Sequence, residues 1–181
     1  MLVTKPYDRE NAYHYAQRWA LGRNPLFYSF TGIGGDCTNF VSQCVYAGSC
    51  TMNYTPVFGW YYVSSYDRTA SWTGVEYFYN FLTRAEESEG PFGREVGAGG
   101  LELGDVVQLG DYTGDFYHTL VVTGFYRGTY LVSAHSYDAL NRRLDSYTYS
   151  QARFLHIDGV RTQQEASTSR CFERLLNGIS L

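Results

Sequence analysis

The chain has 181 residues, of which 44% are hydrophobic and 18% are charged, which fits one folded domain with a substantial core rather than a disordered chain. Its net charge is −4 and its basic residues are scattered, which argues against a nucleic-acid surface or a polybasic membrane patch. No apolar run of about 18 residues predicts a transmembrane helix, and the first residues lack a signal-peptide pattern. We expect a soluble protein, cytoplasmic as given or exported if a leader has been removed.

The first half of the chain predicts helices. Apolar residues recur at the spacing of one helix face in three stretches, residues 9–21, 37–48 and 75–84. Asp8 is a suitable N-cap for the first helix, and residues 73–76 resemble a capping box for the third. Residues 49–70 read as a long aromatic loop around Trp60, which either packs over the core or forms a binding rim.

The second half predicts an antiparallel sheet. Short apolar runs indicate strands at residues 106–109, 118–123, 130–135 and 153–157, with a hairpin loop at 127–129. An acidic turn at 86–91 and a glycine-rich link at 96–100 separate this half from the helices. Helices followed by antiparallel strands are typical of an α+β domain. We assign that domain to residues 1–160 and a C-terminal appendage, with a weak helical pattern, to residues 161–181. The oligomeric state stays open.

The four cysteines give no sign of a metal site. Cys37, Cys44, Cys50 and Cys171 contain no CxxC pair and no Cys/His spacing typical of zinc. On one helix, Cys37 and Cys44 would lie about 10 Å apart along the axis, too far for a disulfide. The pattern therefore does not suggest a disulfide-linked scaffold, and we expect neither a metal nor another cofactor.

Cys37 follows two glycines and Asp36 at the start of the second predicted helix. Unpaired backbone N–H groups and the helix dipole at that position favour a thiolate, so we expect a lowered thiol pKa and a nucleophile. Asp36 would cap the helix and position it. The Cys37 amide would stabilise an oxyanion, with Tyr28 as a second group. The competing interpretation is a buried structural cysteine, the commoner fate of this residue type.

A cysteine nucleophile needs a base from elsewhere in the fold. Among the four histidines, His118 begins a predicted strand, and His135 ends the partner strand of the same hairpin. The two side chains should therefore lie at one end of the strand pair. His118 would take the thiol proton, while His135, or alternatively Asp138 or Asn141, would hold the His118 ring in its working tautomer. The competing interpretation gives both histidines structural hydrogen bonds at strand ends.

The segment Gly35-Asp36-Cys37-Thr38-Asn39-Phe40-Val41-Ser42-Gln43-Cys44 resembles the signature of the putative amidase domain family of bacteria. Other stretches resemble that family in the same order, at residues 15–20, 24–25, 71–72, 103–108, 135–142 and 154–157 and in the strand of His118. The resemblance extends over about residues 7–160 and leaves the tail outside.

This family is allied to the NlpC-like and CHAP cysteine peptidases of the papain-like superfamily. The resemblance therefore implies a papain-like core, in which the cysteine helix packs on a small antiparallel sheet. It implies Cys37 as nucleophile, His118 as base and His135 as third member, although Ser136 stands where a familiar version has Thr. It also implies hydrolysis of an amide bond in a peptide or cell-wall muropeptide through a thioester acyl-enzyme. Two alternatives stay open: an acyl transferase of the same fold, and a catalytically silent module that binds peptide or glycan through the loop around Trp60.

Overall fold

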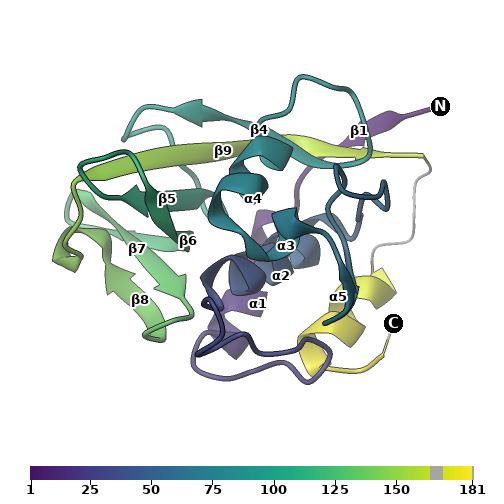
Figure 1. Cartoon of the computed structure of the whole chain (residues 1–181), viewed down its shortest axis with the longest axis horizontal. Coiled ribbons are helices and arrows are strands. Elements are labelled where there is room, and N and C mark those ends of the chain that lie inside the picture. Colours follow the sequence, from purple (N-terminus) through teal and green to yellow (C-terminus); the bar gives the residue numbers. More distant parts are fainter. Residues whose placement is uncertain (164–168, 181) are drawn as a thin grey trace.

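The structure, a computed structural model, describes residues 1–163 and 169–180 and has an α+β architecture (Figure 1). Its helices are α1 (Arg9–Trp19), α2 (Cys37–Ser49), α3 (Ala70–Thr73), α4 (Val75–Leu82) and α5 (Ser169–Asn177), with a short 3-10 helix at Leu144–Ser146. The main sheet contains β1 (Val3–Lys5), β4 (Gly90–Val96), β5 (Val106–Gly110), β6 (Phe116–Tyr126), β7 (Thr129–Ala134), β8 (Ala139–Arg143) and β9 (Gln151–Thr162). A small hairpin is formed by β2 (Tyr62–Ser64) and β3 (Asp67–Arg68).

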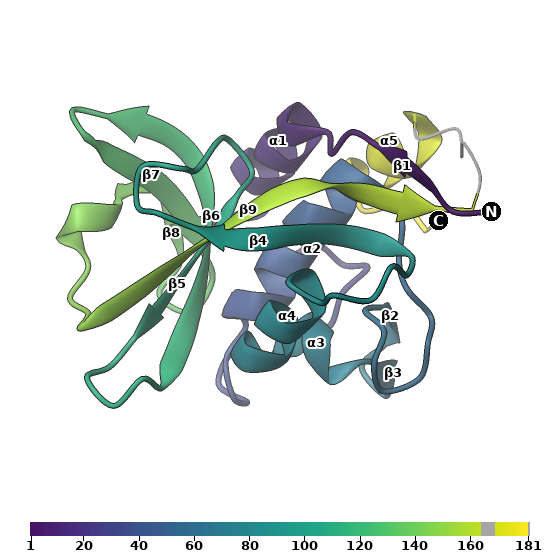
Figure 2. The same cartoon turned by 90° about the horizontal axis from the view of Figure 1, so that it is seen from above.

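The main sheet is antiparallel and runs in the order β1-β9-β5-β6-β7-β8, with β4 also paired to β9. The long strand β9 joins two parts of this sheet, because it pairs with β1 and β4 along one stretch and with β5, which leads to β6, β7 and β8, along another. Seen from above in Figure 2, β5 to β8 gather at one end of the molecule, whereas β4 and β9 continue over the helices. The start of α2 lies against β6.

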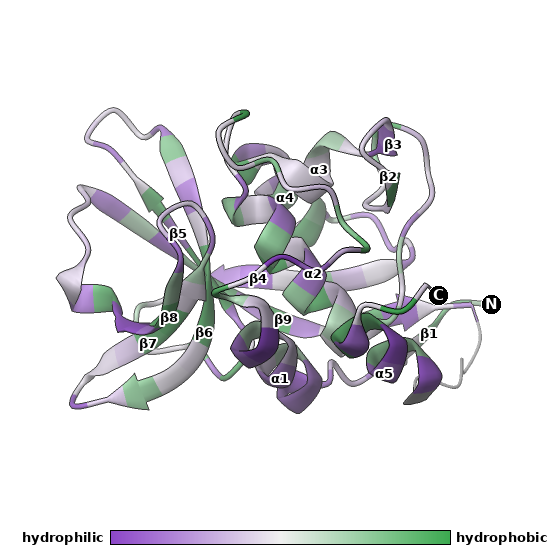
Figure 3. Cartoon of the chain, turned by 90° about the horizontal axis from the view of Figure 1, so that it is seen from below, coloured by the Kyte–Doolittle hydropathy of each residue, from purple (hydrophilic) through white to green (hydrophobic). Residues whose placement is uncertain are grey.

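Helix α2 is the centre of the packing, and all 13 of its residues are buried. In Figure 3 it lies between α1 and α5 on one side and α3 and α4 on the other, while α1 and α5 turn hydrophilic faces outward. Gly48 allows the N-terminal segment to cross it closely, because a Cβ there would lie 2.3 Å from Cε2 of Tyr7. Trp60 is also fully buried, its ring lies tilted against that of Trp72 with centroids 4.6 Å apart, and it donates to Ser42 Oγ. The ring of Trp60 therefore belongs to the core and is not available as a binding rim.

The predicted helices agree with α1, α2 and α4 to within two residues, and the four predicted strands correspond to β5, β6, β7 and β9. The expected capping box at residues 73–76 does not form, because Gly74 is the N-cap of α4 and provides no side chain. Strand β4 lies between the expected acidic turn and the expected glycine-rich link, and only its two ends overlap them. Its Gly90-Pro91 start is a turn signal, but β9 pairs with it along its whole length.

The C-terminal helix α5 docks on α1 and α2, with Leu175 fully buried. Side chains of the preceding helices and loop bond its carbonyls: Asn24 Nδ2 donates to Leu175 O, and Trp19 Nε1 donates to Leu176 O. A disulfide joins Cys50 to Cys171, contrary to the expectation from sequence. The two cysteines are 121 positions apart, so no local spacing reveals their pairing.

Candidate active site

A cavity of about 390 Å³ opens where α2 begins. Six parts of the chain line this cavity: the approach to α2 and its first residue, β5, β6, the β7–β8 turn, β8 and the segment after the 3-10 helix. The lining residues are Gly34, Gly35, Cys37, Leu109, Tyr117, His118, Ser136, Tyr137, Arg142, Tyr147 and Thr148. The structure thus brings Cys37 and His118 to one cavity. The register of the sheet places Leu109 opposite His118.

Two threonines fix the start of α2 against β6 beside His118. Thr38 and Thr119 share a hydrogen bond of 2.8 Å between their hydroxyls, and Gln108 Nε2 donates to the Thr119 hydroxyl at 3.2 Å. Because Thr38 and Thr119 directly follow Cys37 and His118, this bond fixes the two backbones next to each other. Within the described residues, the Cys37 amide has no acceptor. That N–H is free to donate to a developing oxyanion.

Burial raises the pKa of the Cys37 thiol, and this effect exceeds the lowering by hydrogen bonds from the Thr119 backbone and from Thr38. The charge of Asp36 adds to the increase. The expected lowering of the Cys37 pKa at the helix start is therefore wrong for this cavity. Removing the thiolate from water costs more than the hydrogen bonds from Thr119 and Thr38 return.

Burial also lowers the pKa of His118 to about 4, with a further contribution from the positive charge of Arg142. The His118 ring lies 6.1 Å from the ring of Tyr147, between centroids, and has no hydrogen-bond partner among the described residues. Near neutral pH the ring is therefore a neutral imidazole with an available lone pair. Together with the raised pKa of Cys37, this places a neutral thiol and a neutral base in the same cavity.

His135 does not meet His118. Its Nδ1 lies 2.5 Å from Oδ2 of Asp36, its Nε2 lies 2.9 Å from the carbonyl oxygen of Trp19, and its ring stacks on Phe40 at 4.1 Å. Both ring nitrogens of His135 therefore have partners other than His118. The structure therefore turns His135 toward the helices instead of giving it the expected contact with the His118 ring. Neighbouring strand ends share an edge, but side chains on them alternate between faces.

The two alternative orienting residues and Tyr28 also have other partners. Asp138 accepts two hydrogen bonds of 2.9 Å from the guanidinium of Arg23, and the side-chain amide of Asn141 pairs with that of Gln17. The Tyr28 amide donates to the Tyr62 hydroxyl, outside the cavity lining. None of these three expected site residues lines the cavity.

Asp36 shapes the loop before Cys37 rather than capping α2, because its side chain makes no capping hydrogen bond. Burial raises the pKa of Asp36, but hydrogen bonds from His135, the Phe30 amide and Asn39 lower it more, so the carboxylate is ionised. The Asp36 amide donates to Ser136 Oγ at 2.9 Å. These contacts tie Asp36, the residue before Cys37, to the β7–β8 turn, so Asp36 has a positioning role.

Sequence reasoning did not single out Arg142 or Tyr147. The Arg142 guanidinium lies 3.9 Å from the centroid of the Tyr147 ring, and both residues line the cavity. Arg142 belongs to a stretch that resembles the family signature, but its place at the cavity depends on the pairing of β8 with β7. The spacing within a single strand does not reveal that neighbourhood.

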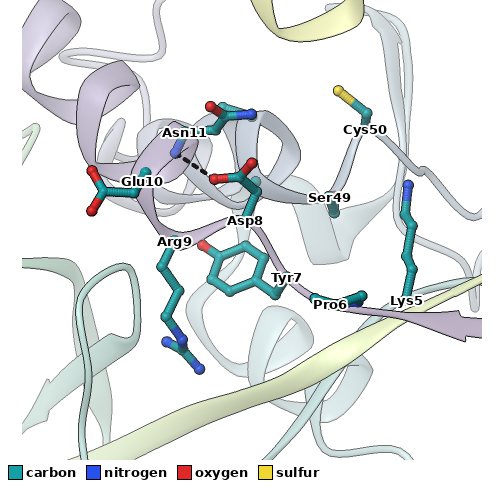
Figure 4. Close-up of a pocket in the computed structure, with 11 residues that line it drawn as sticks. Lys5, Pro6, Tyr7, Asp8, Arg9, Glu10, Asn11, Ser49 and Cys50 are labelled. Atoms are coloured by element: carbon teal, nitrogen blue, oxygen red, sulfur yellow. Dashed lines mark hydrogen bonds between the residues drawn. The ribbon is translucent and has the colours of Figure 1, made fainter. Parts of the chain in front are cut away.

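A second cavity, of about 490 Å³, lies beside the N-terminal segment (Figure 4). Asp8 lines it and caps α1 through a 2.9 Å hydrogen bond from the Asn11 amide. Neither a histidine nor a free cysteine lines this cavity, since its Cys50 is in the disulfide. Across residues 1–163 and 169–180 the structure shows no cluster of three or more His, Cys, Asp or Glu side chains suited to a metal. No helix within those ranges is long and apolar enough to span a membrane.

Comparison with known proteins gives a family for this chain. The family described as "Putative amidase domain" matches residues 6–157. The uncharacterized protein YhbB of Bacillus subtilis (strain 168) is 34% identical over 163 residues, which cover 83% of this chain and 50% of the relative. The chain therefore spans about half the length of that relative. No solved structure matches it significantly. Because the match extends over most of the sequence, the chain belongs to the putative amidase domain family.

Proposed function

We propose that this chain is a cysteine-dependent amide hydrolase of the papain-like kind, related to the NlpC-like and CHAP peptidases. The observation that carries the proposal is that Cys37, at the first residue of α2, and His118 line the same cavity. The unbonded Cys37 amide supports it, as does the family's association with amidases. A nucleophile, a base and an oxyanion donor are the parts that acyl transfer from an amide requires.

In the first step the Cys37 sulfur attacks the amide carbon while the neutral imidazole of His118 takes the thiol proton. A C–S bond forms, and the electron pair of the carbonyl π bond moves to the oxygen, which accepts a hydrogen bond from the Cys37 amide. Because thiol and imidazole are both neutral at rest, proton transfer accompanies attack rather than preceding it. The imidazolium then gives its proton to the amide nitrogen, and the C–N bond breaks.

The remaining thioester is hydrolysed by the same groups. His118 takes a proton from water as the water oxygen attacks the thioester carbon, and the C–S bond breaks when the tetrahedral intermediate collapses. The sulfur regains its proton and the carboxylic product leaves. This sequence needs Cys37 and His118 alone, while Asp36 and His135 hold the backbone before Cys37. We propose a peptide or cell-wall muropeptide as substrate.

Acylation by p-nitrophenyl acetate tests the nucleophile and base without knowledge of the substrate. The wild type should form an acetyl adduct on Cys37, detected by mass spectrometry of peptides, together with release of p-nitrophenol. Cys37→Ala should abolish the adduct, and His118→Ala should slow its formation by roughly 10²-fold or more, the usual contribution of general base catalysis. Cys44→Ala is the matched control, because Cys44 is the other free, buried cysteine of α2.

The same variants should be incubated with muropeptides, and new amino groups should be counted by mass spectrometry. Wild type and Cys44→Ala should release them, whereas Cys37→Ala should not. Acetylation that persists at the wild-type rate in folded Cys37→Ala, or that is unchanged in His118→Ala, contradicts the proposal.

A further inference from the structure

The cavity that contains Cys37 and His118 has an uneven charge. Of the side chains that line it, Arg142 alone carries a permanent charge, and no Asp or Glu is among them. This contrasts with the chain as a whole, in which acidic residues outnumber basic ones and the net charge is −4. The cavity is therefore locally positive in an acidic protein, and an anionic ligand would meet no opposing carboxylate on its walls.

The Arg142 guanidinium is held in place but keeps donors available. Its Nε donates to Ser146 Oγ at 2.9 Å and its Nη2 to the Ser146 carbonyl at 3.1 Å, while its plane lies over Tyr147. These contacts occupy two of the five N–H groups, so that three remain, two of them on Nη1. A fixed planar fork of this kind matches a carboxylate well.

Arg142 has no carboxylate partner in the part of the chain that the structure describes. Its neighbour Arg143 forms an ion pair with Asp145 at 2.7 Å, and Arg23 donates hydrogen bonds to both carboxylate oxygens of Asp138. Asp145 and Asp138, the acidic residues closest to Arg142 in the sequence, are thus paired with other arginines. The positive charge of Arg142 instead acts on His118, whose pKa it lowers by opposing protonation of the imidazole.

We propose that Arg142 binds a carboxylate that the substrate carries next to its scissile amide, so that the enzyme acts on acidic peptides. The inference rests on the proposed function of Cys37 and His118 and adds the substrate class. The bound carboxylate also offsets the positive charge that opposes protonation of His118. Substrate binding then favours the imidazolium that forms during attack, so that recognition and activation are coupled at one residue.

The test compares two reagents that differ in one charge. Iodoacetate and iodoacetamide alkylate the same Cys37 thiolate and expel the same iodide, but iodoacetate alone carries a carboxylate. The ratio of their rate constants at Cys37 is therefore independent of the thiol pKa. Arg142→Gln should lower this ratio by roughly tenfold, the value of one charge-assisted hydrogen bond. Arg142→Lys keeps the charge without the planar fork, so it should retain part of the wild-type preference for iodoacetate.

Arg143→Gln is the matched control, since it removes the same charge from the adjacent position of β8 but outside the cavity lining. It should leave the ratio unchanged. An equal fall in Arg143→Gln, or no fall in Arg142→Gln, overturns the inference. Failure of the proposed function is seen separately, because it removes acetylation by p-nitrophenyl acetate, whereas failure of the inference leaves acetylation intact.

Protection experiments identify the source of the carboxylate. N-acetylglycine offers a terminal carboxylate, N-acetylglutamic acid α-amide offers a side-chain carboxylate, and N-acetylglutamine amide offers neither. Either acid should slow iodoacetamide labelling of Cys37 in the wild type and not in Arg142→Gln, and the acid that does so assigns the terminal or side-chain source. Equal protection by the neutral compound, or protection by none of the three, contradicts recognition of an acidic peptide.

Discussion

His135 and Asp36 form a buried pair, with Nδ1 of the histidine 2.5 Å from Oδ2 of the aspartate and both side chains 1% exposed. The pair joins the end of β7 to the residue before Cys37. It therefore holds the cavity wall and the start of α2 in one arrangement. In a Cys–His–His triad a ring nitrogen of His135 would have to contact His118, but Nδ1 contacts Asp36 and Nε2 contacts the Trp19 carbonyl.

Removing one member of this pair should destabilise the fold. Asp36→Ala or His135→Ala leaves a buried polar side chain without its hydrogen-bond partner, so each should lower the free energy of unfolding by about 1–3 kcal/mol. The double variant should cost less than the sum of the two, as a double-mutant cycle from urea denaturation would measure.

The same His135 variant separates positioning of the loop from orientation of the base. If His135 acts through the fold, the rate of Cys37 acetylation in the folded fraction should keep the acid limb of its pH profile. A shifted acid limb in His135→Ala would instead support the triad that sequence alone suggests. His14→Ala serves as a control, because His14 is exposed and lies outside the cavity.

The acid limb of Cys37 acetylation should lie near pH 4. Only the neutral form of His118 accepts a proton, and burial with the charge of Arg142 lowers its pKa to about 4. An ordinary histidine base would give a limb near its usual pKa of about 6.5. Arg142→Gln should move the limb toward higher pH, because one cause of the lowered pKa is removed. A wild-type limb near 6.5 would show that the His118 ring is solvated.

His118 should also make stability depend on pH. Between about pH 6.5 and 4 the unfolded chain binds a proton at this histidine and the folded chain does not, so stability falls as the pH falls. The loss should approach about 3 kcal/mol by pH 4, relative to a His118→Gln variant. Urea denaturation of both proteins across this range measures the difference. Parallel curves would contradict the buried neutral imidazole.

Gly35 should not tolerate a side chain. Its φ of 101° lies in the left-handed region, and a Cβ would stand 3.5 Å from Ser136 Oγ. Gly35→Ala should cost about 1–3 kcal/mol of stability and slow acetylation of Cys37, because the approach to α2 shifts. Gly97→Ala is the control, since that glycine has open space around it and no positive φ. Equal effects of the two substitutions would show that the loop before Cys37 is not specifically constrained.

The Cys50–Cys171 disulfide should stabilise the docking of α5. It links positions 121 residues apart, so its loss should lower the free energy of unfolding by about 2–5 kcal/mol. Cys171→Ala and wild type in dithiothreitol should melt at the same lowered temperature, whereas Cys44→Ala should still respond to dithiothreitol. Such bonds persist in oxidising compartments. Alkylation of all four cysteines in the native, unreduced protein would contradict the bond.

Local patterns in the sequence determined a large part of this fold. Helical spacing placed Cys37 at the start of α2, since a helix is built from hydrogen bonds and side-chain contacts within four residues. Runs of apolar residues located β5, β6, β7 and β9. They did not locate β4, whose Gly90-Pro91 start lacks any local strand signal and which is held by its pairing to β9.

The sequence by itself therefore determined the elements, the α+β order and the choice of Cys37 and His118 as candidates. Only the tertiary structure decided which side chains meet. It paired His135 with Asp36, joined Cys50 to Cys171 and placed Arg142 at the cavity. It also reversed the expected direction of the Cys37 pKa. The physical reason is common to all four, because burial and partnership depend on segments that are distant in the chain, and no local spacing records them.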